Sequence, residues 1–202
     1  YKKRLYFLQN IFSSINKKVI ATYGFCLPNK GFKELIQAIH ILKLNNINIR
    51  LNIFSAIYSQ DYHWFYQELV ELIEELSLEK LVTINTKYMD DIETFDHLSN
   101  HDCLIFPYQT SSESSSASVR NALSTLRPVL VTPIDIFSDV SELVEYLPGV
   151  SPEDIASGLI KFFANKSYVV NYKSDEFVRK KSIVQQRSFA KVANRILSLI
   201  KS

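Results

Sequence analysis

Apolar residues follow two spacings along this chain of 202 residues. Short unbroken runs predict buried strands, and longer stretches with an apolar residue every three or four positions predict helices with one apolar face. The predicted strands are residues 19–23, 49–54, 81–84, 103–106 and 128–132. The predicted helices are residues 31–44, 62–76, 90–98, 153–165 and 176–200, with one more after the Ser-rich stretch 110–118.

Strands that alternate with helices predict a parallel sheet, because the stretches between the strands are too long for hairpins. The predicted fold class is therefore α/β, with a parallel sheet of about six strands and helices on both of its faces. Parallel strands end at a common edge, where open α/β sheets bind ligands. We expect Tyr23, Phe54, Ile84 and Phe106 at that edge, and Asp90 or Asp91 as the N-cap of the helix that they precede.

The chain divides by pattern into three parts. Residues 1–17 are predicted to be a linker or lead-in helix, residues 18–172 the main domain, and residues 173–202 a basic helix. We expect that last helix to pack back on the main domain or on its partner. The chain begins at Tyr1, which we interpret as a sign that it is a piece of a longer polypeptide.

The formal net charge of +2 hides a strong asymmetry. Residues 1–19 contain no acid, and residues 173–202 carry many basic side chains against only Asp175 and Glu176, so the middle of the chain is acidic. Basic ends favour contact with a partner domain or an anionic membrane surface, and two solvated amphipathic helices are the plainer alternative. The residues expected to pack on protein are Phe189, Val192, Ile196 and Leu199, and those expected to stay hydrated are Lys181, Arg187, Lys191 and Arg195.

Several kinds of site and partner are not indicated. No apolar run reaches the ~18 residues that a membrane-spanning helix needs. Cys26 and Cys103 lie in or beside apolar runs, which favours buried free thiols and a reducing cytosol. His97 and His101 lack a third ligand at a metal-binding spacing, and basic residues do not interleave with aromatic ones, so we expect neither a metal site nor nucleic-acid binding.

Lys30 lies between Gly24 and Gly31, at the start of a predicted helix. The positive end of the helix dipole disfavours a lysine there, whereas a bound anion would balance it. Lys30 and the first free N–H groups of the helix are therefore predicted to hold a phosphate, and an exposed lysine after a tight turn is the alternative. Neither the P-loop pattern nor the GxGxxG pattern is present.

The stretch from Phe106 to Pro133 reads FPYQTSSESSSASVRNALSTLRPVLVTP, a strand, a Ser-rich turn, a helix and another strand. Its turn offers hydroxyls, free N–H groups and the carboxylate of Glu113 at the ligand-binding edge. The alternative is a flexible linker with a solvated glutamate. Arg120 and Asn121 fall one turn into the helix, near enough to face the same cleft, although Arg120 could equally pair with an acid on a neighbouring helix.

Two segments at the right separation resemble the carboxy-terminal domain of GT-B glycosyltransferases of family 4, the glycosyl transferases group 1. The first is YGFCLPNKG followed by ELIQA, which resembles the family pattern GRLxxxKGxxxLIxA. The second comprises HDCLIFP, ES, NAL and RPV, which resemble ADxxxxPS…ESFGxxxxEAMAxGxPVV. The likeness covers roughly residues 18–165.

The resemblance implies roles for particular residues. Lys30 matches the lysine that holds the donor diphosphate, and Glu113 matches a glutamate that contacts the donor sugar; these two are the implied catalytic residues. The loop 86–89, with Tyr88, matches one that lies against the nucleotide base. The other implied donor-binding residues are Gly24, Ser114, Ser116, Ala117, Ser118, Arg120 and Asn121. No metal or other cofactor is implied.

Three positions depart from the family pattern. Asn121 stands where the family has a second glutamate, Phe25 where it has an arginine, and Ser116 where it has a glycine. Asparagine can still donate and accept, but it loses the charge-assisted hydrogen bond. These departures indicate a divergent branch in which Arg120 serves as a substitute contact to phosphate or sugar.

By resemblance, the chain is a Rossmann-like donor-binding domain, one half of a GT-B fold. The implied enzyme is a retaining, metal-independent glycosyltransferase that moves a hexose from a nucleotide sugar to a growing bacterial envelope polysaccharide or glycan. It would act in the cytoplasm or at the inner face of the cytoplasmic membrane. The amino-terminal acceptor domain is missing, so this fragment alone is expected to be inactive. The alternatives are a non-catalytic scaffold module, which the changes at Phe25 and Asn121 favour, and a nucleotide-sugar epimerase of similar architecture.

Overall fold

The computed structural model describes residues 18–165 and 172–200. The chain divides into two compact units, residues 1–168 and residues 169–202, and each is described by itself. The predicted lead-in helix in residues 1–17 lies outside the described residues. Within the part of the chain that is described, no helix is both long enough and apolar enough to cross a membrane.

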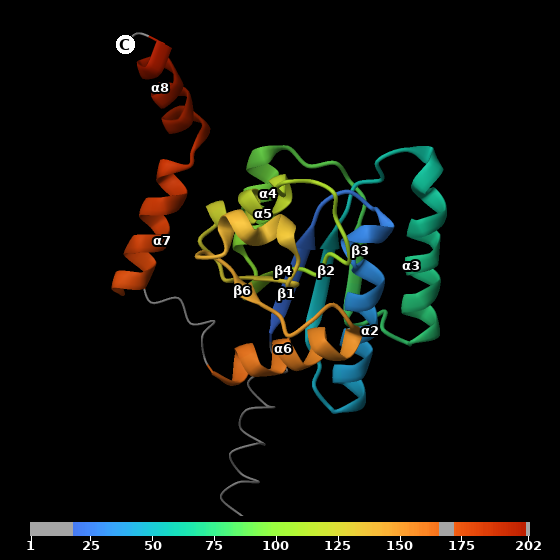
Figure 1. Ribbon diagram of the computed structural model, residues 1–202. Coiled ribbons are helices and arrows are strands. Elements are labelled where there is room, and N and C mark those ends of the chain that lie inside the picture. Colours follow the sequence, from blue (N-terminus) through green and yellow to red (C-terminus); the bar gives the residue numbers. More distant parts are fainter. Residues whose placement is uncertain (1–17, 166–171, 201–202) are drawn as a thin grey trace, which may run out of the picture. The chain divides into compact units, whose positions relative to one another are not determined.

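The first unit is built on one sheet of six parallel strands in the order β3-β2-β1-β4-β5-β6 (Figure 1). The strands are β1 (Val19–Tyr23), β2 (Arg50–Phe54), β3 (Val82–Asn85), β4 (Cys103–Phe106), β5 (Val129–Val131) and β6 (Glu145–Tyr146). The chain builds outward from β1 in one direction as far as β3, then crosses over and continues from β4 in the other direction. This order confirms the predicted α/β, Rossmann-like fold, and it places the topological switch point between β1 and β4.

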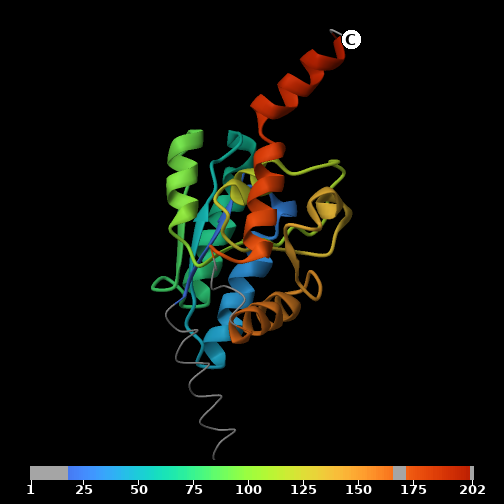
Figure 2. The same cartoon turned by 90° about the vertical axis from the view of Figure 1, so that its left-hand side faces the viewer.

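Helices cover both faces of this sheet (Figures 1 and 2). They are α2 (Phe32–Leu44), α3 (His63–Glu75), α4 (Asp91–Ser99), α5 (Ala117–Ser124) and α6 (Pro152–Ala164), with short 3-10 helices η1 (Pro28–Lys30), η2 (Gln60–Tyr62) and η3 (Asp135–Val140). α2 packs against α3 and α6 on one face, and α4 packs against α5 on the other. Asp90 caps α4 as predicted, since its carboxylate accepts from the N–H groups of Ile92 and Glu93.

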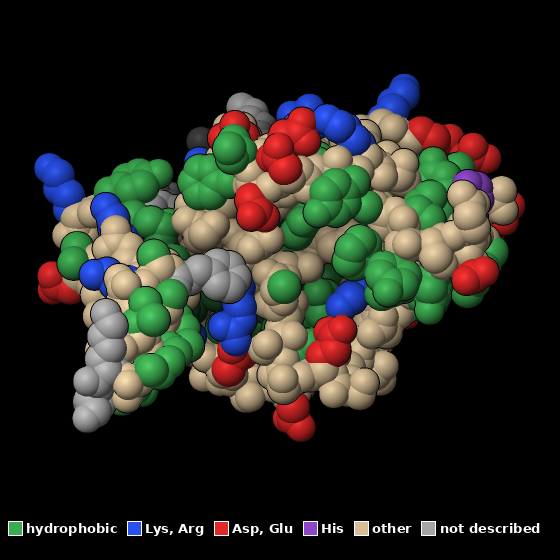
Figure 3. All heavy atoms as spheres, turned by 90° about the horizontal axis from the view of Figure 1, so that it is seen from above, with side chains coloured by type: hydrophobic (Ala, Val, Ile, Leu, Met, Phe, Trp, Pro, Cys, Tyr) green, Lys and Arg blue, Asp and Glu red, His purple; other side chains and the backbone are tan. Residues whose placement is uncertain are grey.

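The four residues predicted to share one sheet edge do so. Tyr23, Phe54 and Phe106 are the last residues of their strands, and Ile84 is one residue from the end of β3. Tyr23 is paired with Phe54 in a parallel register, so the strands end together. Figure 3 looks down on this carboxyl edge, where apolar, basic and acidic side chains all reach the surface.

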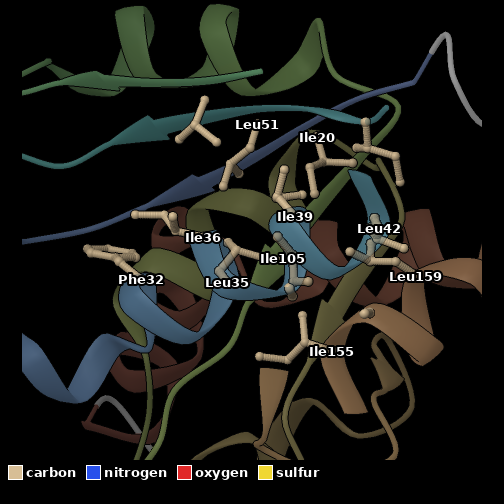
Figure 4. Packing of buried hydrophobic residues seen from close by; sticks show 14 of the residues in the cluster. Ile20, Phe32, Leu35, Ile36, Ile39, Leu42, Leu51, Ile105, Ile155 and Leu159 are labelled. Carbon is tan, nitrogen blue, oxygen red and sulfur yellow. The ribbon is translucent and has the colours of Figure 1, made fainter. Parts of the chain in front are cut away.

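α2 is the helix that fixes the geometry of this edge. It lies between the sheet and α6, and Figure 4 shows its side chains packed against Ile20 and Leu51 of the sheet and Ile155 and Leu159 of α6. Its fully buried residues are Phe32, Leu35, Ile36, Ala38, Ile39 and Leu42. Each large apolar side chain contributes roughly 1.5–3 kcal/mol on burial, so this packing holds the helix firmly with its N-terminus at the carboxyl edge.

Both cysteines are buried and free, as predicted. Cys26 follows β1 and Cys103 begins β4. Burial raises the pKa of the Cys26 thiol and raises the pKa of the Cys103 thiol well above its usual value. Both side chains therefore remain protonated and pack as small apolar groups.

Two expectations about secondary structure were wrong or incomplete. The single helix predicted over residues 176–200 is two helices, α7 (Asp175–Gln186) and α8 (Phe189–Ile200). Ser188 occupies the break, and its carbonyl accepts from the N–H of Val192, so this serine takes the N-cap position that serine favours. Strand β6 is not among the five predicted strands, because its two residues are exposed and form no apolar run.

The second unit consists of α7 and α8. Val192, Ile196 and Leu199, which were expected to pack on protein, are exposed in this chain, and the side chain of Phe189 lies outside the described part. Their packing against a partner therefore stays a prediction.

Candidate functional site

The candidate site lies at the carboxyl ends of β1 and β4. Two loops meet there, residues 24–31 after β1 and residues 107–116 after β4. Open α/β sheets bind ligands at the carboxyl ends of neighbouring strands whose connections run in opposite directions. β1 and β4 are the pair at which this sheet reverses its order.

Hydrogen bonds join the two loops to each other. The backbone N–H of Gln109 donates to the carbonyl of Asn29 (3.0 Å), and the side-chain amide of Asn29 donates to the carbonyl of Thr110 (3.3 Å). The side-chain amide of Gln109 donates to the carbonyls of Pro107 and Val150, both at 3.0 Å. These hydrogen bonds hold the two loops together without the help of a ligand.

Gly31 allows the loops to approach this closely. Its φ of 73° lies in the left-handed region, which side chains disfavour. A Cβ atom at this position would also overlap the carbonyl oxygen of Pro107. Both the backbone conformation and the contact with the second loop thus require glycine.

Lys30 is the last residue of η1, and its side chain is only 10% exposed. Its ammonium nitrogen lies 4.0 Å from the centre of the Tyr108 ring and 3.8 Å from Oε2 of Glu113. The alternative of an exposed lysine is therefore wrong. The Glu113 side chain is 62% exposed, and a loose pair with an exposed carboxylate contributes little, so Lys30 retains charge that an anion can neutralise.

The N-terminus of α2 adds donors beside this cation. The first backbone N–H groups of a helix have no partners within the helix, and Gly31 has no side chain to cap them. In contrast, α5, α6 and α7 each begin with a serine whose hydroxyl accepts from a backbone N–H. The start of α2 is therefore suited to an external acceptor such as a phosphate oxygen.

The Ser-rich segment supplies the opposite wall. Ser116 is buried, caps α5 by accepting from the N–H of Val119 (3.3 Å), and lies 3.1 Å from the hydroxyl of Tyr108. This end of the segment is therefore part of the folded domain, contrary to the linker alternative. The hydroxyl of Ser111 accepts from the N–H of Glu113 (3.1 Å), and Ser114 is exposed.

Gly24 of the first loop lies beside Ser118 in the first turn of α5. A Cβ atom on Gly24 would come within 3.1 Å of Oγ of Ser118. Ala117 is exposed at the first turn of α5. The structure thus brings together Gly24, Lys30, Glu113, Ser116 and Ser118.

Five of the predicted residues are not joined to this cluster by the described contacts: Ser114 and Ala117, which are exposed, and Arg120, Asn121 and Tyr88. Arg120 forms an ion pair with Asp139, which bears out the alternative of pairing with an acid, although Asp139 belongs to the 3-10 helix η3. Asn121 is half-buried, and Tyr88, in the loop after β3, is 73% exposed. A donor-binding role for these residues stays a prediction.

Sequence reasoning missed Tyr108. The ammonium of Lys30 lies over its ring, and its carbonyl accepts a hydrogen bond from the hydroxyl of Thr132 (2.6 Å). Its ring also lies 5.2 Å from that of Phe137, centre to centre. The one available signal was its position directly after a buried strand, two residues past Phe106.

Phe25 occupies the position at which the resemblance implies an arginine. It is 42% exposed, and its ring meets that of Tyr58 edge to face with 5.2 Å between their centres. Backbone hydrogen bonds from Gly24 to Phe54 and from Cys26 to Ala56 hold the loop after β1 beside the loop after β2. The carboxyl edge therefore carries the aromatic pair Phe25–Tyr58 at the position where the family pattern has an arginine.

The histidines have a structural arrangement. Nε2 of the buried His101 lies 2.8 Å from the side-chain amide nitrogen of Asn52, and its Nδ1 lies 2.8 Å from the carbonyl of His97. Both ring nitrogens are thus occupied, and burial lowers the pKa of His101. Among the residues that the structure describes, no three His, Cys, Asp or Glu side chains form a possible metal site.

A hollow of about 600 Å³ lies elsewhere, between α2, α3 and the start of α6. Its lining includes Glu68, Glu71, Glu75 and Glu153. Four carboxylates repel a diphosphate, so this groove is a poor nucleotide site despite its size.

Comparisons with known proteins agree with the fold. The family model described as "Glycosyl transferases group 1" matches residues 9–181. No curated protein sequence matches the chain. Among solved structures, Alr3699/HepE of Anabaena in complex with UDP and glucose has a TM-score of 0.74 at 14% identity, over 100% of this chain and 53% of its own.

Two further structures show the same fold. The C-terminal domain of the group 1 glycosyl transferase LpcC of Francisella tularensis has a TM-score of 0.66 at 16% identity, over 91% of this chain and 92% of that domain. Sucrose-phosphate synthase of Thermosynechococcus elongatus has a TM-score of 0.72 at 13% identity, over 95% of this chain and 48% of its own. The chain thus spans about half the length of these larger structures, HepE and sucrose-phosphate synthase.

The sheet order, the two hydrogen-bonded loops and the family match lead to one conclusion. This chain has the Rossmann-like fold of one half of a GT-B glycosyltransferase, and it belongs to the glycosyl transferases group 1 family.

Proposed function

We propose that this chain is the donor-binding half of a glycosyltransferase and that it binds a nucleotide sugar at the carboxyl edge of its sheet. The observation that carries the proposal is the buried ammonium of Lys30 beside the uncapped start of α2. That pairing of a fixed cation with free N–H donors suits a diphosphate. The structural neighbour HepE was solved with UDP and glucose, and with UDP-glucose, which supports this class of ligand.

The proposed chemistry follows from the charges. When the bond between sugar and phosphate breaks, negative charge develops on the leaving nucleoside diphosphate. Lys30 and the N–H groups of α2 are aimed at that charge before the reaction begins, which is the most effective form of electrostatic stabilisation. Glu113 lies 3.8 Å from the ammonium of Lys30, and its carboxylate can accept hydrogen bonds from sugar hydroxyls.

The finer details rest on the family resemblance. We propose transfer of a hexose with retention of configuration and without a metal ion, since protein donors supply the positive charge. The proposed acceptor is a growing bacterial envelope polysaccharide or glycan, on the cytoplasmic side of the membrane. The acceptor-binding half is expected to lie outside this chain, so transfer requires the complete protein.

A non-catalytic scaffold is the second candidate, and two observations favour it. The edge presents Phe25 where the family pattern has an arginine, and Asn121 where it has a glutamate. A scaffold would keep the fold and lose affinity for the donor. Binding of the nucleotide therefore separates the two candidates.

The test is calorimetric titration of the 202-residue chain with UDP, comparing wild type, Lys30→Ala and the control Lys33→Ala. Lys33 lies in the first turn of α2, but its ammonium pairs with Glu68 of α3. We expect Lys30→Ala to cost about 1.5–3 kcal/mol of binding free energy, the range for a hydrogen bond to a charged group, and Lys33→Ala to cost little. Equal affinity of wild type and Lys30→Ala would remove Lys30 from the site, and no binding of any nucleoside diphosphate by wild type would favour the scaffold.

A further inference from the structure

The aromatic ring of Tyr108 lies directly against the ammonium of Lys30. The nitrogen sits over the ring, 4.0 Å from its centre, which is well within the ~6 Å over which the face of an aromatic ring attracts a cation. Because the Lys30 side chain is only 10% exposed, water competes little with the ring, and the attraction is stronger than it would be at an exposed site. The ring therefore holds the ammonium without neutralising its charge.

Tyr108 is itself held on several sides. It is buried, and its carbonyl accepts a hydrogen bond from the hydroxyl of Thr132 (2.6 Å). Its own hydroxyl lies 3.1 Å from Oγ of Ser116, and its ring packs on that of Phe137 with 5.2 Å between their centres. The position of the ring is thus set by the folded domain, and the lysine rests on a fixed surface.

A lysine gains more from such a surface than most side chains. Its four-carbon stem samples many rotamers, and fixing one of them costs more conformational entropy than for almost any other residue. Glu113 also lies near the ammonium, at 3.8 Å, but its side chain is 62% exposed and holds the lysine only loosely. A lysine that spends only part of its time in the binding position lowers the affinity for a ligand by that fraction.

We propose that Tyr108 is a positioning residue for the diphosphate: the face of its ring keeps the ammonium of Lys30 beside the uncapped start of α2. The inference rests on the proposed function, because it concerns the same site. Tyr108 acts through Lys30 and need not touch the nucleotide itself. Its hydroxyl also links the ring to Ser116, the N-cap of α5, so one side chain anchors both walls of the site.

The experiment is calorimetric titration of the 202-residue chain with UDP, comparing wild type with three variants. Tyr108→Leu removes the ring, and Tyr108→Phe keeps the ring and removes only the hydroxyl. Phe137→Leu is the matched control, because it removes the buried ring of η3 that packs on Tyr108 and leaves Tyr108 in place. We expect Tyr108→Leu to lose about tenfold in UDP affinity, and the other two variants, which keep an aromatic ring under Lys30, to lose about threefold or less.

A double-mutant cycle with Lys30→Ala shows whether Tyr108 acts through the lysine. In the Lys30→Ala background the ring has no ammonium to hold, so adding Tyr108→Leu should cost little further UDP affinity. A tyrosine that only stabilises the fold would cost about the same tenfold in either background.

A trifluorinated phenylalanine at position 108 tests the contact without opening a cavity. Fluorine draws electrons out of the ring and weakens the negative charge of its face, while the shape of the ring changes little. UDP affinity should fall from that of Tyr108→Phe towards that of Tyr108→Leu, at an unchanged melting temperature. This comparison decides the matter even if Tyr108→Leu does not fold.

Four outcomes would overturn the proposal. They are equal UDP affinity of wild type and Tyr108→Leu, equal losses in Tyr108→Leu and Phe137→Leu, the same loss with and without Lys30, and equal affinity of the fluorinated variant and Tyr108→Phe. In each case wild type still binds UDP and Lys30→Ala still weakens that binding, so the proposed function stands. A wild-type chain that binds no nucleoside diphosphate would instead overturn the proposed function and this inference with it.

Discussion

Two lysine–carboxylate pairs bridge β1 and β4, one at each end of these strands, and they are built in opposite ways. At the amino end, Nζ of Lys18 lies 3.0 Å from Oδ1 of Asp102, and the other carboxylate oxygen accepts from the backbone N–H of Val19 (2.9 Å). At the carboxyl end, Lys30 and Glu113 are 3.8 Å apart, and the lysine rests on an aromatic ring. We call the hydrogen-bonded pair at the amino end the closed pair and the looser pair at the carboxyl end the open pair.

The difference lies in where the carboxylate sits. Asp102 immediately precedes β4, where the backbone itself holds it in place, and its side chain is 30% exposed. Glu113 lies seven residues beyond the end of β4, and its side chain is 62% exposed. The amino-end pair can therefore stabilise the fold, while the carboxyl-end pair leaves its lysine able to take another anion.

The largest expected effect comes from adding a side chain at Gly31, where the two loops meet. Gly31→Ala forces a side chain into a left-handed backbone position and against the carbonyl of Pro107. We expect the free energy of unfolding, measured by urea denaturation, to fall by about 3 kcal/mol, and UDP binding to be lost. A loss below about 1 kcal/mol would show that the loops can separate cheaply and that the hydrogen bonds between them contribute little.

Glu113→Gln tests the open pair through catalysis. The substitution keeps the shape of the side chain and removes its charge. In the full-length protein we expect transfer to slow by about 100-fold, equivalent to about 2.7 kcal/mol of transition-state stabilisation, with near-native stability. UDP binding should hardly change, because this ligand contains no donor sugar. A lower melting temperature with intact transfer would make Glu113 a structural residue.

Asp102→Asn tests the closed pair. The amide cannot replace the charge-assisted bonds to Lys18 and to the N–H of Val19. We expect a loss of about 1–2 kcal/mol in unfolding free energy, since Asp102 is partly exposed, and no change in UDP affinity. The exposed Asp96→Asn on α4 is the control and should shift stability by less than about 0.5 kcal/mol. If Asp102→Asn weakened nucleotide binding instead, the two ends would not be independent.

The smallest expected effect is a pH dependence at the amino end, where the buried His101 precedes Asp102. Burial lowers the folded-state pKa of His101, although its hydrogen bonds to the backbone of His97 and Leu98 act against this. The unfolded chain then binds the proton more readily, so stability should be full above the ordinary histidine pKa of about 6.5 and fall as the pH drops below it.

Thermal or urea unfolding between about pH 7.5 and 5 measures this slope, which for one proton cannot exceed about 1.4 kcal/mol per pH unit. His101→Gln should flatten it, and the exposed His97→Gln should not. An unchanged slope in His101→Gln would assign the dependence to other groups.

The strands of the sheet were predictable from the sequence wherever burial is strong. Apolar runs give β1 and β4 to within a residue, because their side chains are buried on both faces of the sheet. β6 was not predicted, because Glu145 and Tyr146 are both exposed. The break before α8 was not predicted either, because it contains neither glycine nor proline. The pattern of apolar residues identifies a strand or helix only when the buried positions of that element are the apolar ones.

The site was predictable in part. Lys30 and Glu113 follow neighbouring strands, so topology alone brings them to one edge. The contact of the Lys30 ammonium with the Tyr108 ring joins two separate segments of the chain, and so does the pairing of Arg120 with Asp139. The sequence carries no local pattern that predicts such contacts. Likewise, Lys18 and Asp102 lie 84 positions apart, and only the folded sheet makes them neighbours.

The hydrogen bonds from Gln109 and Asn29 have a consequence for the speed of binding. Because these bonds already order the two loops in the unliganded protein, a nucleotide does not have to wait for the site to form. Its arrival should be limited by collision, so the observed association rate should rise in proportion to ligand concentration without reaching a plateau. The entropic cost of ordering these loops falls on folding and not on binding, so it does not reduce the affinity for the ligand.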